Sequence, residues 1–149
     1  MYRMIVVDDE EIMRAGIGRI IEWADFGIEI VGEARDGEEA LAQIRELRPD
    51  LMILDIEMPR MSGLAVLEKL RGQPDAPMVI VLSGYDNFDY VRNSMRLGAQ
   101  NYLLKPVDVG ELEATISDTV GAIADIAAQK MQFSETLASL RNNTLNRLL

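Results

Sequence analysis

Five polar side chains stand directly after four short apolar runs, and together their types suit chemistry on a phosphate. Asp8 and Asp9 follow the first run, Asp55 the second, Ser83 the third and Lys105 the fourth. Short all-apolar runs are typical of strands buried on both faces of a parallel sheet. Parallel strands open their carboxyl ends into one crevice, so we expect these side chains to meet there. Three carboxylates, a hydroxyl and an ammonium at one edge predict a site for a divalent metal and a phosphoryl group.

The three carboxylates would repel one another unless a cation lies among them. Mg²⁺ suits this place, because it takes one or two carboxylates, keeps waters and completes its octahedron with phosphate oxygens. One carboxylate can then act as nucleophile and form an aspartyl-phosphate. We expect Asp55 in that role because it ends the third, central strand, with Asp8 and Asp9 holding the metal. Ser83 and Lys105 are the expected partners of the phosphoryl oxygens.

Taken singly, these residues have simpler explanations. An aspartate after a strand is usually a helix cap, so Asp9 could cap the first helix. Lys105 could be a solvated residue before a proline. Complementary groups after all four runs favour the joint site.

Composition narrows the chemistry further. The 149 residues suit one domain, and the absence of Cys and His excludes disulfides, a thiolate nucleophile and a Ser-His-Asp triad. A net charge of −10 argues against direct nucleic-acid binding by this segment. No apolar stretch approaches the length that spans a bilayer, and Met1 leads straight into a strand, so we expect a cytoplasmic protein without membrane contact.

Apolar periodicity predicts five strands alternating with five helices, a doubly wound α/β fold with helices on both faces of a parallel sheet. A short acceptor followed three residues on by Glu predicts helix starts at Asp36 and Asp108, and we expect Ser62 to cap a further helix. The remaining expected bounds are 10–22 and 87–97 for the first and fourth helices, 23–28 for a loop and 29–33 for the second strand.

The last part of the chain predicts an extended helix. After Glu111 there is no proline, and Gly121 is the only glycine. Apolar residues recur there at a four-three spacing that favours pairing with a second copy as a coiled coil. The alternative is that the first half packs on the sheet and the end frays, since Asn142 and its neighbours interrupt the spacing. We therefore expect a domain over 1–120 and a dimerising linker helix over 121–149. The spaced residues are Ile116, Ile123, Ile126, Phe133, Leu137 and Leu140, with Lys130 at one seam position.

Four motifs occur in order along the chain and carry a family resemblance. With them the chain resembles a bacterial response-regulator receiver domain, the phosphorylated half of two-component signalling, over about residues 1–120. The resemblance implies a flavodoxin-like fold with strand order 2-1-3-4-5. The motifs are Val7-Asp8-Asp9-Glu10, Asp55-Ile56-Glu57-Met58-Pro59-Arg60-Met61-Ser62-Gly63, Leu82-Ser83-Gly84-Tyr85, and residues 97–106, which end in Leu104-Lys105-Pro106.

The resemblance also implies roles at the site. Asp55 would accept a phosphoryl group from a histidine kinase and would also be a ligand of the Mg²⁺. Asp9 would bind Mg²⁺ directly and Asp8 largely through water. The backbone carbonyl of Glu57 would be a further ligand. Ser83 and Lys105 would bind the phosphoryl oxygens.

Other positions would have structural or switching roles. The bond between Lys105 and Pro106 would be cis, and Gly63 would be a structural glycine of the second motif. Tyr102 would turn inward as Ser83 moves, whereas by itself it is simply an aromatic residue in a strand. Glu57 departs from the family pattern by adding an acid beside the site.

Two segments, Tyr85–Tyr90 and Leu103–Asp108, look like those of regulators whose output is an AraC-type helix-turn-helix domain. We expect transcription regulation through such a domain, which this chain lacks, so that DNA is reached only through it. The receiver would be no enzyme beyond slow autodephosphorylation.

Two rival interpretations stay open. Asp55-Ile56-Glu57 imitates the Asp-x-Asp motif of haloacid-dehalogenase-like phosphatases. In that family, however, the acidic pair comes last, and this chain has no insertion long enough for a cap over a substrate. The other rival is a pseudo-receiver that is never phosphorylated and only dimerises.

Overall fold

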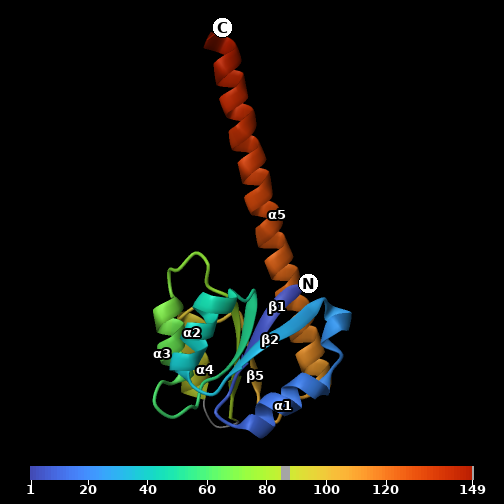
Figure 1. Cartoon of the computed structure of the whole chain (residues 1–149), viewed down its shortest axis with the longest axis vertical. Coiled ribbons are helices and arrows are strands. Elements are labelled where there is room, and N and C mark those ends of the chain that lie inside the picture. The colour runs from blue at the N-terminus through green and yellow to red at the C-terminus, as the bar shows by residue number, and fades with distance from the viewer. Residues whose placement is uncertain (85–87, 149) are drawn as a thin grey trace.

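The computed structural model of the chain describes residues 1–84 and 88–148, and of residues 143–148 only the backbone. Its strands form one parallel sheet in the order β2-β1-β3-β4-β5 (Figure 1), which confirms the predicted α/β fold and strand order. The strands are β1 (Tyr2–Val7), β2 (Ile28–Ala34), β3 (Leu51–Asp55), β4 (Met78–Ser83) and β5 (Asn101–Leu104). The helices are α1 (Glu11–Ile20), the 3₁₀ helix η1 (Trp23–Phe26), α2 (Gly37–Leu47), α3 (Gly63–Leu70), α4 (Phe88–Arg96) and α5 (Val109–Leu148).

Helices cover both faces of the sheet. α2, α3 and α4 lie over one face and α1 and α5 over the other (Figure 1). Alternate residues of each central strand feed two separate cores, so that Val7 and Leu54 join the α2–α3 side while Val6 and Ile53 join the α1–α5 side. Every residue of β3 is buried. The first three apolar runs are therefore strands packed on both faces, as their composition predicted, whereas in the fourth, on β5, only Leu103 is buried.

The predicted helix caps are present. The Asp36 side chain accepts a hydrogen bond from the backbone N–H of Glu39 at 2.8 Å, and Asp108 accepts one from Glu111 at 2.9 Å. Ser62 accepts the N–H of Ala65 at 3.3 Å. Each cap satisfies one of the amide groups that a helix leaves unpaired at its start.

The region after α1 differs from the prediction. α1 ends at Ile20 instead of about residue 22, and the expected loop over 23–28 contains a 3₁₀ helix. The buried Trp23 explains both, because its indole N–H donates to the carbonyl of Ile17 at 2.9 Å and so satisfies an acceptor at the end of α1. β2 is one residue longer at each end than 29–33. The predicted start of the fourth helix, Asn87, lies outside the described residues, within which α4 begins at Phe88.

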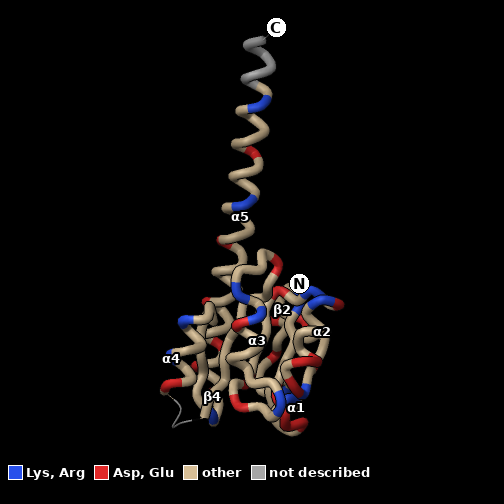
Figure 2. The backbone as a smooth tube through the Cα atoms, turned by 90° about the vertical axis from the view of Figure 1, so that its left-hand side faces the viewer, with Lys and Arg blue, Asp and Glu red and all other residues tan. Residues whose placement is uncertain are grey.

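α5 is one helix of 40 residues, so the structure supports the extended helix. Its first part packs on the sheet through Leu112 and Ile116. The remainder leaves the body at the amino-terminal edge of the sheet as a single rod in both views (Figures 1 and 2). Among the described residues, no helix is long and apolar enough to cross a membrane.

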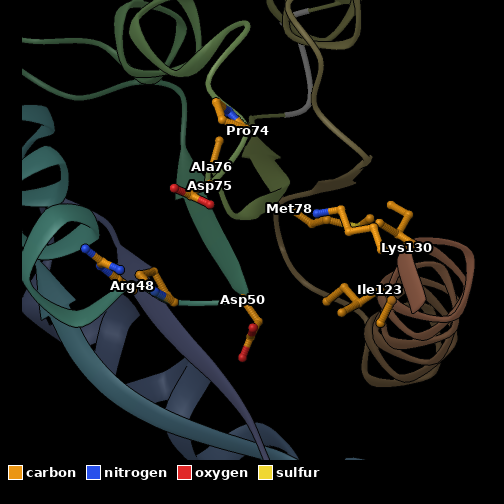
Figure 3. A pocket seen from close by; sticks show the side chains of 11 residues that line it. Arg48, Asp50, Pro74, Asp75, Ala76, Met78, Ile123 and Lys130 are labelled. Atoms are coloured by element: carbon orange, nitrogen blue, oxygen red, sulfur yellow. The ribbon is translucent and has the colours of Figure 1, made fainter. Parts of the chain in front are cut away.

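A hollow of about 410 Å³ lies where α5 leaves the body. Ile123 and Lys130 form its helix wall, and Asp50 and Asp75 lie on the loops that face them (Figure 3). These loops precede β3 and β4, so the hollow is at the opposite edge of the sheet from the predicted carboxylate site.

Candidate functional site

Four strands deliver the predicted residues to one edge of the sheet. β1 pairs with β3 so that Val7 lies beside Leu54, which places Asp8 next to the end of β3 at Asp55. β3 pairs with β4 so that Asp55 lies beside Leu82, one residue before Ser83. Ser83 in turn lies beside Leu104, and Lys105 follows. The side chains that the sequence predicted to meet therefore share the carboxyl-terminal edge of the sheet.

Lys105 links the two buried carboxylates of this edge. Its ammonium nitrogen lies 3.3 Å from Asp8 Oδ2 and 3.4 Å from Asp55 Oδ2. The side chain of Asp8 is 0% exposed and that of Asp55 is 2% exposed. Two carboxylates buried this closely need a shared cation, and the lysine supplies one.

Backbone groups hold the second oxygen of each carboxylate. Asp8 Oδ1 accepts the N–H of Glu10 at 2.9 Å, and Asp55 Oδ1 accepts the N–H of Glu57 at 3.2 Å. Both carboxylates thus have fixed directions. Ser83 is fully buried beside them, and its hydroxyl makes a long hydrogen bond of 3.4 Å to the carbonyl of Gly84. So long a bond leaves the hydroxyl able to turn towards another acceptor.

The surroundings shift the ionisation of this group of residues. Burial raises the pKa of Asp55 from 3.8 to about 6, and the charge of Asp8 raises it as well, while Lys105 and the Glu57 N–H act in the opposite direction. Burial by itself would lower the pKa of Lys105, but Asp55 and Asp8 together raise it above its ordinary value. At neutral pH Asp55 is therefore mostly an anion, as a nucleophile must be.

A second acidic group lies on the loop after β1. Carboxylate oxygens of Asp8, Asp9 and Glu10 all lie within 4.8 Å of one another. These are hard oxygen donors, the ligand type that Mg²⁺ prefers, so the residues fit that ion. The described cluster does not include Asp55, which is joined to Asp8 through Lys105. Glu10 was not among the metal ligands predicted from the sequence, although its position next to Asp9 is a signal.

Asp9 is not the cap of α1. The residue before the helix is Glu10, and its side chain makes no capping hydrogen bond. Asp9 is exposed at the open edge of the site. The alternative interpretation from the sequence, that Asp9 caps the first helix, is therefore wrong.

The loop after Asp55 closes tightly over the strand end. A Cβ atom on Gly63 would lie 2.6 Å from the carbonyl oxygen of Asp55 and 2.8 Å from the Cα of Ile56, so only glycine fits. Gly63 also donates its N–H to the carbonyl of Ile56 at 3.0 Å. The glycine thereby sets the path of the chain beside the carboxylate. Glu57 lies exposed on this loop.

The last two predicted positions lie on and after β5. The peptide bond between Lys105 and Pro106 is cis. Tyr102 is 43% exposed, so its ring lies outside the core in this conformation. Residues 85–87, part of the segment that resembles AraC-type regulators, lie outside the described residues.

Residues 4–117 match the response regulator receiver domain. The chain belongs to this family. The receiver is 37% identical over 139 residues to the transcriptional regulatory protein HptR of Staphylococcus aureus. This match covers 93% of the receiver chain but 53% of HptR, so the chain spans about half the length of that relative.

Solved receivers share the fold. The REC domain of AraT, a response regulator from Geobacillus stearothermophilus, has a TM-score of 0.76 at 35% identity and is matched over 87% of this chain and 98% of its own. The CheX–CheY–BeF₃–Mg²⁺ complex from Borrelia burgdorferi has a TM-score of 0.71 at 25% identity, over 80% and 89% of the two chains. These likenesses show that the chain has the receiver fold.

Proposed function

We propose that this receiver is a phosphorylation switch in which Asp55 accepts a phosphoryl group from a histidine kinase. The observation that carries the proposal is the position of the Lys105 ammonium, 3.3 Å from Asp8 and 3.4 Å from Asp55 at the shared strand edge. A buried anionic nucleophile beside a cation and a hydroxyl suits phosphoryl transfer, where charge on the phosphoryl oxygens must be neutralised.

The transfer forms one bond and breaks one. A carboxylate oxygen of Asp55 attacks phosphorus, the phosphorus–nitrogen bond of the donor's phosphohistidine breaks, and the imidazole leaves with the bonding electron pair. Lys105 and Ser83 then bind oxygens of the resulting acyl phosphate. These 149 residues contain no His, so the phosphohistidine of the donor lies outside them.

Mg²⁺ is the proposed cofactor. Asp8 and Asp9 would hold it, with Glu10 as a further carboxylate of the same cluster. Asp55 and the Glu57 carbonyl would be the remaining protein ligands. The ion would neutralise charge on the phosphoryl oxygens. The Mg²⁺ in the Borrelia CheY complex supports this choice of metal.

The test is phosphorylation with acetyl phosphate and Mg²⁺, followed by intact mass spectrometry. We expect one phosphoryl group on the unsubstituted chain and none on Asp55→Asn. Asp50→Asn is the matched control, because Asp50 immediately precedes the same strand at the opposite edge of the sheet and should not affect labelling. Equal labelling of Asp55→Asn and the unsubstituted chain would refute the assignment. Steady release of phosphate from esters would instead favour a phosphatase.

We further propose that residues 121–149 form a linker that dimerises through a tail seam of Ile126, Phe133 and Leu137. These side chains are 41%, 66% and 39% exposed. They continue the apolar face that packs on the sheet through Leu112 and Ile116, and their heptad-like spacing suits a second identical helix.

Sedimentation of two neighbouring substitutions tests the pairing. Phe133→Glu places a charge on the tail seam and should give monomers, whereas Gln132→Glu adds the same charge about 100° around the helix from Phe133, off the seam, and should leave dimers. Monomers in the unsubstituted chain would refute the pairing. Because HptR is a transcriptional regulatory protein of about twice the matched length, we propose that the switch controls transcription through a DNA-binding domain outside this chain.

A further inference from the structure

Arg14 lies on α1, outside the motifs that carry the family resemblance, yet its guanidinium reaches back to the acidic loop Asp8–Glu10. Its Nη1 donates to the backbone carbonyl of Asp8 at 2.6 Å, across six residues of chain. Its Nε lies 3.5 Å from Glu33 Oε1 near the end of β2. The Arg14 side chain is only 15% exposed. One side chain therefore joins α1, β2 and the end of β1.

We propose that Arg14 is a positioning residue for the acidic loop Asp8–Glu10, and that it sets the affinity of the loop for Mg²⁺. The inference rests on the metal-dependent transfer proposed above and adds a residue to that site. Arg14 touches neither Asp55 nor a phosphoryl group, so it acts through the backbone that carries the carboxylates.

The backbone around Asp8 shows how this works. The N–H of Asp8 donates to the carbonyl of Ala34 on β2 at 3.0 Å, which continues the strand pairing by one residue. Its carbonyl, which belongs to the peptide bond that leads into Asp9, accepts Arg14 instead. The orientation of that peptide plane decides where the Asp9 side chain begins. Arg14 therefore fixes the start of the exposed part of the loop.

Glu33 holds the guanidinium from its other side. The Nε atom of Arg14 is buried and makes no hydrogen bond within the described part of the chain, so the contact with Glu33 is ionic only. A guanidinium held at two points is better oriented than one held at a single point, and its planar fork suits the task. A lysine at this position would keep the charge but could not span both partners.

The sign of the effect separates positioning from charge. Arg14 is a cation near a cluster that binds a cation, so removing its charge alone would strengthen Mg²⁺ binding. Loss of positioning would weaken it, and groups that orient metal ligands typically affect metal affinity by about 10- to 100-fold. We therefore expect Arg14→Met to raise the dissociation constant for Mg²⁺ by about 10-fold.

Calorimetric titration of the unphosphorylated chain with Mg²⁺ tests this directly. Arg14→Lys should recover only part of the affinity, and Arg19→Met is the matched control, because Arg19 is an exposed arginine of the same helix. Glu33→Gln removes one of the two contacts of Arg14 and should weaken binding by a smaller factor. If Arg14→Met fails to fold, Arg14→Lys keeps the test valid, because it preserves the charge and changes only the contacts of the guanidinium.

A second readout uses acetyl phosphate. In Arg14→Met the Mg²⁺ concentration for half-maximal phosphorylation should rise in step with the dissociation constant, while the rate at saturating Mg²⁺ stays within about twofold. Unchanged or tighter Mg²⁺ binding in Arg14→Met, or full recovery in Arg14→Lys, would overturn the positioning role while leaving the proposed function intact. Failure of the unsubstituted chain to bind Mg²⁺ would overturn the proposed function and, with it, the role of Arg14.

Discussion

Replacing Asp55 by asparagine should stabilise the fold, and the gain should grow as the pH rises. Burial raises the pKa of Asp55 from 3.8 to about 6, so the folded chain binds this proton more tightly than the unfolded chain does. The contribution of this tighter proton binding to the free energy of unfolding is fully present below about pH 4 and is lost as the pH rises through 6. Asparagine keeps the shape of the side chain and cannot ionise, so it avoids this loss.

The magnitude follows from the two pKa values. A shift from 3.8 to about 6 corresponds to about 3 kcal/mol between the acidic and alkaline limits. About 1.4 kcal/mol of this stability is lost between pH 5 and pH 8. Both pH values lie above the isoelectric point of about 4.5, where the net charge of the chain nears zero. Lys105 stays charged over that range, because its pKa is raised. The loss of its partner Asp55 in Asp55→Asn therefore has the same effect on stability at both pH values and cancels from the difference.

Urea denaturation in EDTA, at both pH values, measures the effect. The stability of Asp55→Asn relative to the unsubstituted chain should increase by about 1.4 kcal/mol from pH 5 to pH 8, which corresponds to a change of about 3–6 °C in the midpoint of thermal unfolding. Asp118→Asn, at an exposed carboxylate of α5, controls for the loss of one negative charge. A difference that is constant with pH, or that shrinks as pH rises, would show that burial does not govern the ionisation of Asp55.

Two further substitutions test other parts of the site. Lys105→Met removes the cation shared by the two carboxylates, so the pKa of Asp55 should rise further and its phosphorylation rate should fall by roughly 100-fold, as measured by mass spectrometry over time. An unchanged rate would contradict the role of the ammonium. Gly63→Ala forces a Cβ to 2.6 Å from the Asp55 carbonyl and should cost about 1–3 kcal/mol in thermal unfolding. Gly18→Ala, in α1 with nothing within 4 Å of its Cβ position, should instead stabilise by about 0.5–1 kcal/mol, and equal effects of the two would refute the steric argument.

The fold was predictable because the apolar pattern of the chain and its helix-capping residues indicate the same strands and helices. Apolar runs without alternation indicate strands buried on both faces, and the caps at Asp36, Ser62 and Asp108 mark helix starts with local chemistry alone. The parallel sheet then brings Asp8 and Lys105, 97 positions apart, within hydrogen-bonding distance. That juxtaposition follows from topology, which is why the candidate site could be assembled before any coordinates.

What was missed depends on contacts between elements. The end of α1 is set by the indole of Trp23, and no local pattern around residues 20–22 reveals that partner. Arg14 is likewise one of many arginines on amphipathic helices, and only the structure shows its bond to the Asp8 carbonyl. The roles of all the site residues, those of Asp9, Tyr102 and Glu57 included, stay predictions, because they concern a metal, a movement and a reaction.

The length of α5 has a mechanical consequence. The 28 residues from Gly121 to Leu148 form a rod of about 40 Å at 1.5 Å per residue. A tilt of about 10° where the rod meets the body would displace its far end by roughly 7 Å, so a small rearrangement at the sheet is amplified with distance. The tail is therefore long enough to serve as a lever arm, in which an ångström-scale change near β5 would become a displacement as large as a side chain.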